Sequence, residues 1–435
     1  MNPTLAQSLT QTHDEIPSLR EILDTLTLQS GFNTNAVIIA ATLLGIAAGI
    51  IGAFALLRKR SLTADALSHA TLPGITAAFL IASALGFNAR SLPILLLGAT
   101  ISGILGVALI HAILSHTRLR EDAAIGIVLS VFFGIGVVLL SVIQSTATSS
   151  AAGLNHFIYG QTAAMLTNDA IIMGTIAFVS IAIALLVMKE ITIVCFNESF
   201  AKVTGIHTGF IDALILALIV LVTVSGLQAV GLILIVAMLI IPPAAARFWT
   251  DRVRVLVLLS ALIGALSGFF GSSVSALLPR KPAGAVIVLC AGSIFILSML
   301  LAPKRGVAAQ IIRQSTLRVR IAIDHILESK YEHPEQHTKA DLALRVMLRA
   351  LGFTNSLSTA SALTKRGLER GRRVHRNHML WEQYLISCAD IAPSHVDWSV
   401  DLVEHVLDDQ LIQRLEREIR ESGLHLDHAS QEARS

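Results

Sequence analysis

The sequence has little charge, few cysteines and few aromatic residues for a chain of 435 residues. Only 14% of the residues are charged, whereas 54% are hydrophobic and the mean hydropathy is +0.69. Several apolar stretches reach about 20 residues, the length that crosses a bilayer, so a soluble globular protein is excluded. The three cysteines, Cys195, Cys290 and Cys388, lie far apart and predict neither a disulfide framework nor a CxxC metal motif.

The sequence also lacks the short motifs of nucleotide hydrolysis and of metalloprotease chemistry. No G-x-x-x-x-G-K-[ST] phosphate loop occurs, so we expect that the chain does not hydrolyse ATP and is not an enzyme. No HExxH motif and no nucleophile–base pair appears, which makes an intramembrane enzyme the weakest alternative. A process that needs ATP would have to obtain it through a separate subunit.

Charge is distributed unevenly along the chain. The first 304 residues contain 15 Lys or Arg and 12 Asp or Glu, whereas the last 131 residues contain 18 of each. Nine of the 15 histidines also lie in this last part. We therefore divide the chain into a polar segment 1–35, expected outside the cell, a membrane domain 36–302, a soluble helical domain 303–421 and a polar tail 422–435.

The membrane domain is predicted to be an all-α, polytopic bundle of nine transmembrane helices. Their expected ranges are 36–57, 66–86, 92–114, 123–143, 169–188, 208–227, 229–248, 253–273 and 283–302. The positive-inside rule assigns the side with most of the Lys and Arg groups, and with it the C-terminus, to the cytoplasm. Pro73, Pro242 and Pro243 are expected to bend or interrupt their helices. Small residues four apart, such as Gly45 and Gly49, predict closely packed helices.

The stretch 58–74 carries a carboxylate and an imidazole one helical turn apart. Asp65 and His69 are separated by four residues, so a helix places both side chains on one face. Ionisable groups within a membrane usually face a cavity or an ion path, and this oxygen–nitrogen pair suits a divalent transition metal. Alternatively, Asp65 is an ordinary helix N-terminal acid and His69 a packing histidine. The chemistry alone favours neither interpretation.

Residues 52–74, which read GAFALLRKRSLTADALSHATLPG, resemble the signature of metal-ion ABC importer permeases. These are the membrane subunits of binding-protein-dependent importers for zinc, manganese or iron. The resemblance implies that Asp65 and His69 line the metal pathway. Ala64 stands where the family commonly has glycine, a small change that we expect to be harmless. Family-like stretches recur over about 36–302.

The segment 197–206 resembles the short cytoplasmic helix of these permeases that docks on the ATPase. The resemblance implies coupling roles for four positions, Asn197, Glu198, Ala201 and Gly205. The segment is amphipathic and ends in a glycine, which is a helix-stop signal. The alternative is an ordinary interfacial connector.

Two stretches of the soluble domain, 363–385 and 400–407, resemble metal-dependent regulators of the diphtheria-toxin-repressor type. The resemblance implies a winged-helix, repressor-like fold and a candidate regulatory site for manganese, iron or zinc. The implied ligands are His378, Asp401, Glu404 and His405. Position 401 is aspartate where the family usually has glutamate, and 306–323 contains none of the acidic ligands that the family takes from its first helix. These departures weigh against metal binding here.

A basic cluster lies at the start of this repressor-like region. It consists of Lys365, Arg366, Arg370, Arg372, Arg373 and Arg376. The repressor resemblance implies salt-sensitive contacts between this cluster and DNA phosphates. A patch attracted to anionic membrane lipid, or a solvated helix face, is the alternative that the equal numbers of acidic and basic residues favour.

Together these features predict the permease subunit of an ABC importer for manganese, iron or zinc in a bacterial cytoplasmic (inner) membrane. The implied partners are a cytoplasmic ATPase subunit, an external metal-binding protein and a second permease subunit, identical or paralogous. No tightly bound cofactor is expected apart from the transported ion. A membrane-tethered, metal-responsive DNA-binding regulator is a competing function that can coexist with transport. A secondary carrier driven by a proton gradient is a third.

Overall fold

The computed structural model describes residues 18–58, 61–87, 91–146, 165, 167–229, 232–278, 283–334, 341–358, 362–387, 412–414 and 417. The chain divides into two compact units, Met1–Ala309 and Gln310–Ser435. Unit 1 contains the apolar helices and unit 2 the charged C-terminal region. Each unit is described by itself below.

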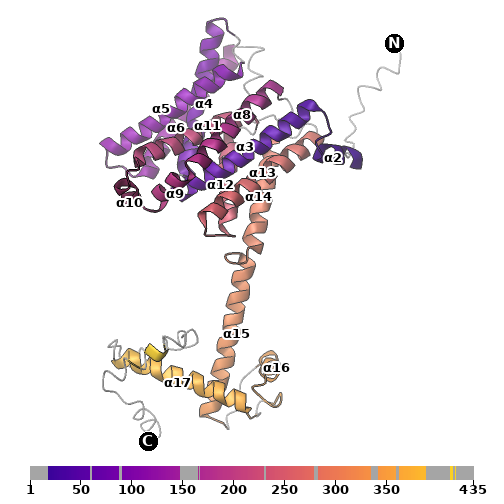
Figure 1. The fold of residues 1–435 in the computed structure, drawn as a ribbon, viewed down its shortest axis with the longest axis vertical. Helices are drawn as coiled ribbons and strands as arrows, with labels where there is room; N and C mark the ends of the chain where they lie inside the picture. The colour runs from indigo at the N-terminus through magenta and orange to yellow at the C-terminus, as the bar shows by residue number, and fades with distance from the viewer. Residues whose placement is uncertain are drawn as a thin grey trace. The chain divides into compact units, whose positions relative to one another are not determined.

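Unit 1 is a helical bundle in which long apolar helices pack side by side (Figure 1). Its helices are α2 (Leu19–Leu26), α3 (Phe32–Leu57), α4 (Ser61–Ala84), α5 (Leu92–His116), α6 (Glu121–Thr146), α8 (Thr167–Leu186), α9 (Met188–Phe196), α10 (Glu198–Val203), α11 (Thr208–Ala229), α12 (Leu232–Arg247), α13 (Val253–Leu277) and α14 (Ala283–Leu301). Within the described ranges, eight helices are long and apolar enough to cross a membrane, and α12 is a shorter apolar helix. Each predicted span coincides with one of these nine helices. The all-α polytopic class is confirmed, whereas the proposed domain limits stay predictions.

Helix α3 lies at the centre of unit 1. It contacts α8, α11, α12 and α13, and 78% of its most apolar window is buried, against 22% for α14. Glycines allow this close packing, because a Cβ atom on Gly45 would collide with the carbonyl oxygen of Gly264 in α13. A Cβ atom on Gly49 would meet the carbonyl oxygen of Ser260 one turn further along. The small-residue spacing therefore brings two backbones together, as predicted.

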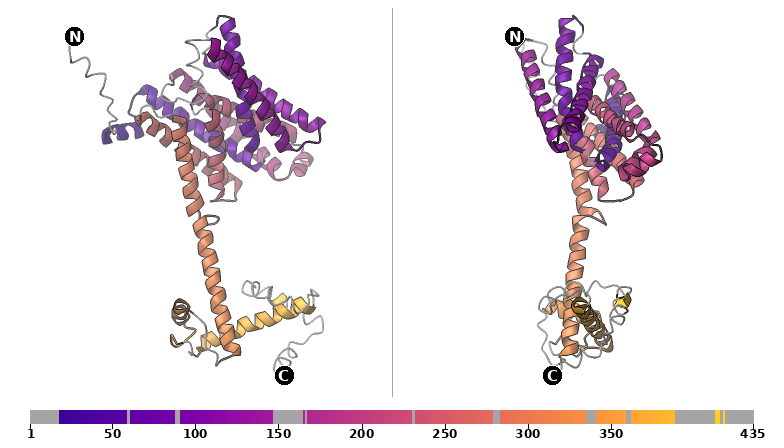
Figure 2. Two further views of the ribbon diagram at one scale, coloured as in Figure 1. Left: turned by 180° about the vertical axis from the view of Figure 1, so that it is seen from behind. Right: turned by 90° about the vertical axis from the view of Figure 1, so that its left-hand side faces the viewer.

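Helices α4, α5 and α6 form a group with an apolar core of its own. Figure 2 shows them together at one side of unit 1, and all three pairs of these helices are in contact. Their shared core includes Ala70 of α4, Ile110 of α5 and Val128 of α6. The Ser102 hydroxyl of α5 donates a hydrogen bond of 2.6 Å to the carbonyl oxygen of Ala70. The helix that carries Asp65 and His69 is thus held mainly by α5 and α6.

The prolines do not interrupt their helices. Helix α4 runs through Pro73, and α12 runs through Pro242 and Pro243. Of the two predicted effects, an interruption is therefore excluded at both places, whereas a bend stays a prediction. Neighbouring helices restrain the backbone around a membrane proline, so the loss of one N–H donor is tolerated.

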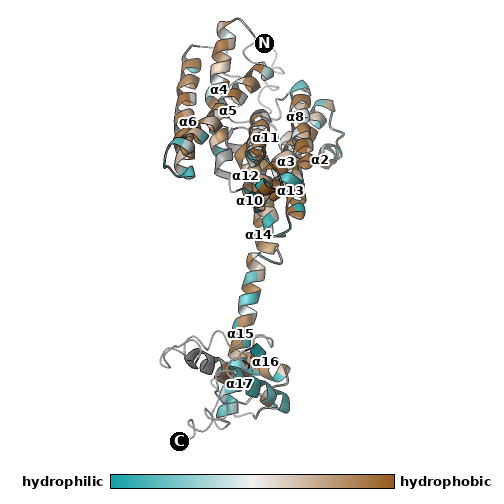
Figure 3. Cartoon of the chain, turned by 60° about the vertical axis from the view of Figure 1, so that its left-hand side comes forward, coloured by the Kyte–Doolittle hydropathy of each residue, from teal (hydrophilic) through white to brown (hydrophobic). Residues whose placement is uncertain are grey.

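Unit 2 contains three described helices of some length, α15 (Val307–Glu332), α16 (Leu342–Ala350) and α17 (Lys365–Ser387). Figure 3 shows hydrophilic and hydrophobic residues interspersed along them, in contrast to the largely hydrophobic helices of unit 1. Their described core is small, with Ile323, Leu327 and Leu348 buried and Phe353 and Leu363 packed against them. A helical C-terminal domain, as the sequence predicts, is present.

Candidate metal pathway, coupling helix and regulatory cluster

Asp65 and His69 lie in the first half of α4, where their four-residue spacing stacks them on one face. The distance between His69 Nε2 and Asp65 Oδ1 is 3.6 Å. Two ligands of one tetrahedral zinc ion, each about 2.1 Å from the metal, are about 3.4 Å apart. An ion could therefore bridge this oxygen and nitrogen with only a small adjustment of the side chains.

The surroundings of His69 hold its ring in place. The imidazole meets the ring of Phe133 of α6 edge to face, with the centroids 5.2 Å apart. His69 Nδ1 is buried without a hydrogen-bond partner in the described part of the chain. The His69 side chain is 19% exposed and that of Asp65 41%. The pair is thus more accessible at Asp65 than at His69, and the Nε2 atom of His69 faces the Asp65 carboxylate.

An ionic cluster around Arg58 joins the end of α3 to three other helices. Arg58 Nε donates a hydrogen bond of 2.9 Å to Asp212 Oδ1 of α11, and a second Arg58 nitrogen donates to Asp212 Oδ2. Arg58 Nη1 also donates to the carbonyl oxygen of Val194 in α9 and lies 3.6 Å from Glu198 of α10. One guanidinium therefore links α3, α9, α10 and α11.

The charges of this cluster reinforce one another. Burial disfavours the Arg58 cation, but the Asp212 hydrogen bond and charge outweigh it, so the pKa of Arg58 is raised above its ordinary value. The hydrogen bond from Lys202 holds the pKa of Glu198 below its usual range. Burial raises the pKa of the neighbouring Cys195 thiol to about 11, although the Arg58 charge acts against that shift. Cys195 is consequently a protonated thiol at neutral pH.

The segment that resembles the docking helix forms the short helix α10. Asn197 caps it, since Asn197 Oδ1 accepts a hydrogen bond of 2.9 Å from the backbone N–H of Phe200. Ala201 is buried, and Gly205 ends the helical stretch with φ at +83°, a value that favours glycine. Glu198 is the member of the predicted set that reaches the Arg58 cluster.

Exposed apolar side chains on α10 and on the neighbouring ends of α9 and α11 form an apolar face. It consists of the exposed side chains Phe196, Phe200, Val203 and Phe210, with Val203 86% exposed. Beside it lies a depression of about 870 Å³, whose lining includes Lys202, Ile206 and His207. An apolar face with a charged edge is typical of a protein-docking surface. Arg58 and Asp212 were missed as site residues, although an acid at the start of an apolar helix could have indicated a partner.

In unit 2, the structure describes part of the predicted regulatory set. His378 lies in α17, where its Nδ1 atom is 3.7 Å from Glu328 Oε1 of α15. Asp401, Glu404 and His405 lie outside the described residues. Whether these four residues meet in one site stays a prediction.

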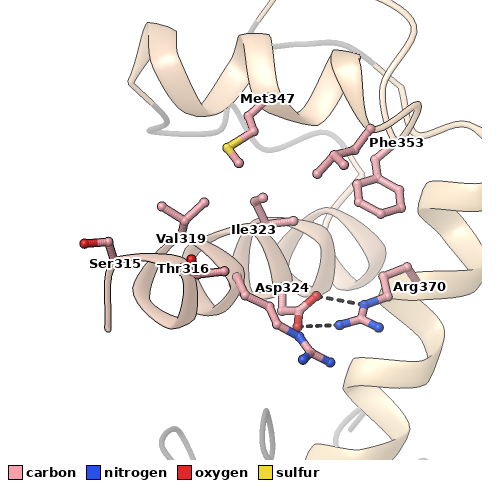
Figure 4. Close-up of a pocket in the computed structure, with 10 residues that line it drawn as sticks. Ser315, Thr316, Val319, Ile323, Asp324, Met347, Phe353 and Arg370 are labelled. Atoms are coloured by element: carbon pink, nitrogen blue, oxygen red, sulfur yellow. Dashed lines mark hydrogen bonds and ion pairs between the residues drawn. The ribbon is translucent and has the colours of Figure 1, made fainter. Parts of the chain in front are cut away.

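The predicted basic cluster lies in the first half of α17, but its members differ. Arg370 forms a bidentate pair with the buried carboxylate of Asp324 in α15, with hydrogen bonds of 2.9 and 2.8 Å (Figure 4). This pair borders a cavity of about 430 Å³ that Met347 and Phe353 also line. The hydrogen bond with Asp324 raises the pKa of Arg370. Arg370 therefore serves packing within unit 2, whereas Lys365, Arg366, Arg372, Arg373 and Arg376 are exposed.

A second group of ligand-type side chains lies at the contact between α15 and α17. Glu328, Glu332 and His375 each bring one oxygen or nitrogen atom to within 4.8 Å of the others. This group was not predicted from the sequence, because the acids expected on the first helix of the domain were placed within residues 306–323, before Glu328. The four-residue spacing of the two glutamates could have indicated a shared helix face.

These features define a class. The bundle of long apolar helices is that of a polytopic membrane protein. The acid–imidazole pair at the start of α4 and the short helix α10 between α9 and α11 are features of a transport protein. Residues 32–302 match the ABC 3 transport family, and the chain belongs to that family. Residues 364–422 match a second family, described as the iron dependent repressor, metal binding and dimerisation domain. Both resemblances inferred from the sequence are confirmed.

Relatives and a solved structure support the assignment. The chain is 37% identical over 377 residues to the "Manganese transport system membrane protein MntC" of Bacillus subtilis (strain 168), covering 83% of this chain and 86% of that protein. It is 42% identical over 287 residues to the "Zinc transport system membrane protein TroC" of Treponema pallidum (strain Nichols), covering 66% and 95%. The structure "PsaBC from Streptococcus pneumoniae in complex with Fab" matches with a TM-score of 0.56 at 33% identity, covering 66% of this chain and 98% of that chain.

Proposed function

We propose that this chain is the membrane permease subunit of an ABC importer for divalent transition-metal ions. An external binding protein delivers the ion, two permease subunits enclose the pathway, and separate cytoplasmic ATPase subunits drive the change of access. The family to which the chain belongs supports this proposal, as do the manganese and zinc named in its relatives. The protein then lies in the bacterial cytoplasmic membrane, with unit 2 in the cytoplasm.

The observation that carries the proposal is the separation of Asp65 and His69. Their facing atoms are 3.6 Å apart, which is close to the separation of two ligands of one ion. Two protein ligands hold an ion weakly enough to release it, which suits a pathway better than a storage site. Manganese, iron and zinc all accept an oxygen–nitrogen pair, so the pair is compatible with each of these three ions.

The Arg58 cluster provides a route from the ATPase to the ion. The exposed apolar face of α10 receives the ATPase, and Glu198 of α10 contacts Arg58 at the end of α3. Helix α4 begins at Ser61, shortly after Arg58, and carries Asp65 in its first turns. A movement of α10 can therefore be passed through Arg58 to the helix that holds the ion.

Metal uptake by single-residue variants tests the proposal. In a bacterial strain without other importers, the complete system carrying Asp65→Asn or His69→Asn should take up radiolabelled Mn²⁺ and Zn²⁺ at least about tenfold more slowly. This is the lower end of the effect of losing even an indirect metal contact. His116→Asn and Asp24→Asn, which change the same residue types outside the pair, should leave uptake unchanged.

Protein level and ATPase co-purification are measured for every variant, so that a failure of assembly is recognised. Unchanged uptake of both ions in correctly assembled Asp65→Asn and His69→Asn variants would refute the proposed pathway. Competition among unlabelled manganese, iron and zinc in the same assay identifies the preferred ion.

The repressor-domain match favours a second function, a metal-responsive regulator attached to the membrane. Five exposed basic residues of α17 offer phosphate contacts to DNA or to anionic lipid headgroups. Gel-shift experiments with the full chain, with and without Mn²⁺, separate these two ligands. Binding to DNA that weakens steeply with salt and requires metal would support the regulator.

A further inference from the structure

We propose that the cavity of unit 2 between α15, α16 and α17 binds a small amphipathic carboxylate, whose apolar body fills the cavity and whose carboxylate binds an arginine at its edge. The cavity has a volume of about 430 Å³. Its described lining contains none of the residues of the proposed transport path and none of the predicted metal ligands. The site is therefore independent of both.

Helix α15 forms one wall of the cavity with side chains that lie on one face of the helix, because they recur three or four positions apart. They are Ser315, Thr316, Val319, Arg320, Ile323 and Asp324. Ile323 belongs to the small core of unit 2, and Val319 packs against that core. The cavity thus continues the core of unit 2 toward the N-terminal half of α15.

The opposite wall is apolar and incompletely covered. It consists of Met347 of α16 together with Leu351 and Phe353, which follow that helix. Figure 4 shows Met347 and Phe353 across the cavity from Val319 and Ile323. Met347 is 43% exposed and Leu351 is 41% exposed, so water reaches apolar side chains here. Replacing this water by an apolar group is favourable, and the wall therefore favours a ligand with an apolar body.

Two contacts hold α17 in a fixed position beside α15. Arg370 donates hydrogen bonds of 2.9 and 2.8 Å to the two carboxylate oxygens of Asp324. One residue further along α17, an added Cβ atom on Gly371 would lie 2.7 Å from the carbonyl oxygen of Leu327. Helices joined by a bidentate pair and by a glycine contact have little freedom to slide. The cavity is therefore formed before a ligand binds, which lowers the entropic cost of binding.

The charges around the cavity favour an anion. The lining contains two cations, Arg320 and Arg370, and one anion, Asp324, which leaves one net positive charge. A further cation lies nearby, since the guanidinium carbon of Arg366 is 5.8 Å from the ring centre of Phe353. Arg370 is bound to Asp324, whereas Arg320 is exposed at the edge of the cavity and can turn toward a ligand. Its planar guanidinium group suits a carboxylate, which can accept two parallel hydrogen bonds from it.

The hydroxyl groups on the α15 wall are already used as donors. Ser315 Oγ donates to the carbonyl oxygen of Ile311 at 2.8 Å, and Thr316 Oγ1 donates to that of Ile312 at 2.7 Å. The arginines are therefore the side-chain donors that this wall offers to an anionic group. One net positive charge matches a monocarboxylate better than a phosphate ester with two negative charges.

The volume limits the body of the ligand. An apolar cavity of about 150 Å³ holds one benzene ring. A cavity of about 430 Å³ therefore has room for two rings or for a short aliphatic chain. A ligand of this class would contact α15, α16 and α17 at once, so the stability of unit 2 would rise with the concentration of the ligand.

Photolabelling of the full chain in lipid nanodiscs tests the site. The probe is 4-benzoylbenzoate, a two-ring monocarboxylate whose ketone reacts with nearby C–H groups under near-ultraviolet light. The neutral analogue 4-benzoylbenzamide is the matched control probe. Mass spectrometry should show saturable labelling of peptides that contain Val319 or Met347. The carboxylate should reach half-saturation at a concentration about tenfold lower than the amide, because one charge-assisted interaction is lost in the amide.

Two variants separate the charge of the site from its shape. Arg320→Gln should weaken labelling by the carboxylate about tenfold and leave labelling by the amide unchanged. Arg320 is exposed, so this change should not prevent folding. Met347→Trp should fill the cavity and abolish labelling by both probes. Arg318→Gln, at an exposed arginine of α15 outside the lining, should change neither. Thermal unfolding of each variant identifies any loss of the fold.

Three results would overturn the proposal. The first is equal affinity for the carboxylate in the Arg320→Gln variant and in the unchanged chain. The second is equal affinity of the unchanged chain for the carboxylate and the amide, since the cavity would then not select an anion. The third is labelling that does not saturate and spreads over the helices of unit 1, as simple partition of the probe into lipid would produce.

Discussion

The two units of this protein each contain a bidentate Arg–Asp pair, but the pairs act in different surroundings. Arg58 and Asp212 lie at the end of a membrane bundle whose helices approach through glycine contacts. Arg370 and Asp324 lie in a unit with a small described core. Helices gain little from moving apolar side chains out of lipid, so unit 1 depends on close backbone packing. Unit 2 combines a small apolar core with a buried ion pair between α15 and α17.

The largest effect is expected from breaking the glycine contact in unit 1. Gly45→Val would place a branched side chain against the backbone of Gly264, where neither α3 nor α13 can give way. Overpacking of this kind costs about 1 to 3 kcal/mol or more, and here it should prevent the bundle from forming. The measurement is the yield of monodisperse protein after solubilisation.

Gly292→Val is the matched control, because an added Cβ atom at Gly292 has no neighbour within 4 Å among the described residues. Its yield should equal that of the unchanged chain. Equal yields for Gly45→Val would show that α3 and α13 can separate without loss of the fold, and the contrast between the units would fail.

The two ion pairs should respond differently to loss of the arginine. Arg370→Met removes the bidentate hydrogen-bond partner of Asp324, whose side chain is only 2% exposed, and this should destabilise unit 2 by about 3 to 5 kcal/mol. Arg58→Met removes a partner of Asp212. Because the Asp212 side chain is 20% exposed, this substitution should reduce stability less than Arg370→Met does. Uptake should show the opposite order, since Arg58 lies on the proposed coupling route.

Thermal unfolding and metal uptake of both variants provide the comparison, with the exposed Arg372→Met as the control. A double change, Asp324→Leu with Arg370→Met, should recover part of the lost stability because it also removes the buried carboxylate. A larger loss of uptake for Arg370→Met than for Arg58→Met would contradict the assigned roles.

The smallest effect is expected at the cap of α10. Asn197→Ala removes the side-chain acceptor for the Phe200 N–H and should cost about 1 kcal/mol of local helix stability. Hydrogen exchange at the Phe200 amide should then become roughly fivefold faster. Asn197→Asp keeps an acceptor and should exchange at nearly the original rate, whereas equal exchange in all three proteins would rule out the capping role.

Much of unit 1 follows from the sequence, because membrane spans are long and their apolar character is local. The positions of the eight long apolar helices and of the shorter α12, the small-residue contacts of α3 and the glycine stop of α10 are read from neighbouring residues. At the prolines of α4 and α12 the sequence left open whether the helix is bent or interrupted, and the structure excludes an interruption, because the local rule ignores the helices that pack around them.

The sequence alone determined the membrane class, the separate charged unit and the common face of Asp65 and His69, because each depends on residues within a few turns. The tertiary structure decided the partners. Arg58 meets Asp212 across 154 positions, and Arg370 meets Asp324 across 46. It also brought His375 of α17 to the glutamates of α15 through a glycine contact. Helical periodicity predicts which side chains share a face, whereas only the packing of whole helices decides which faces meet.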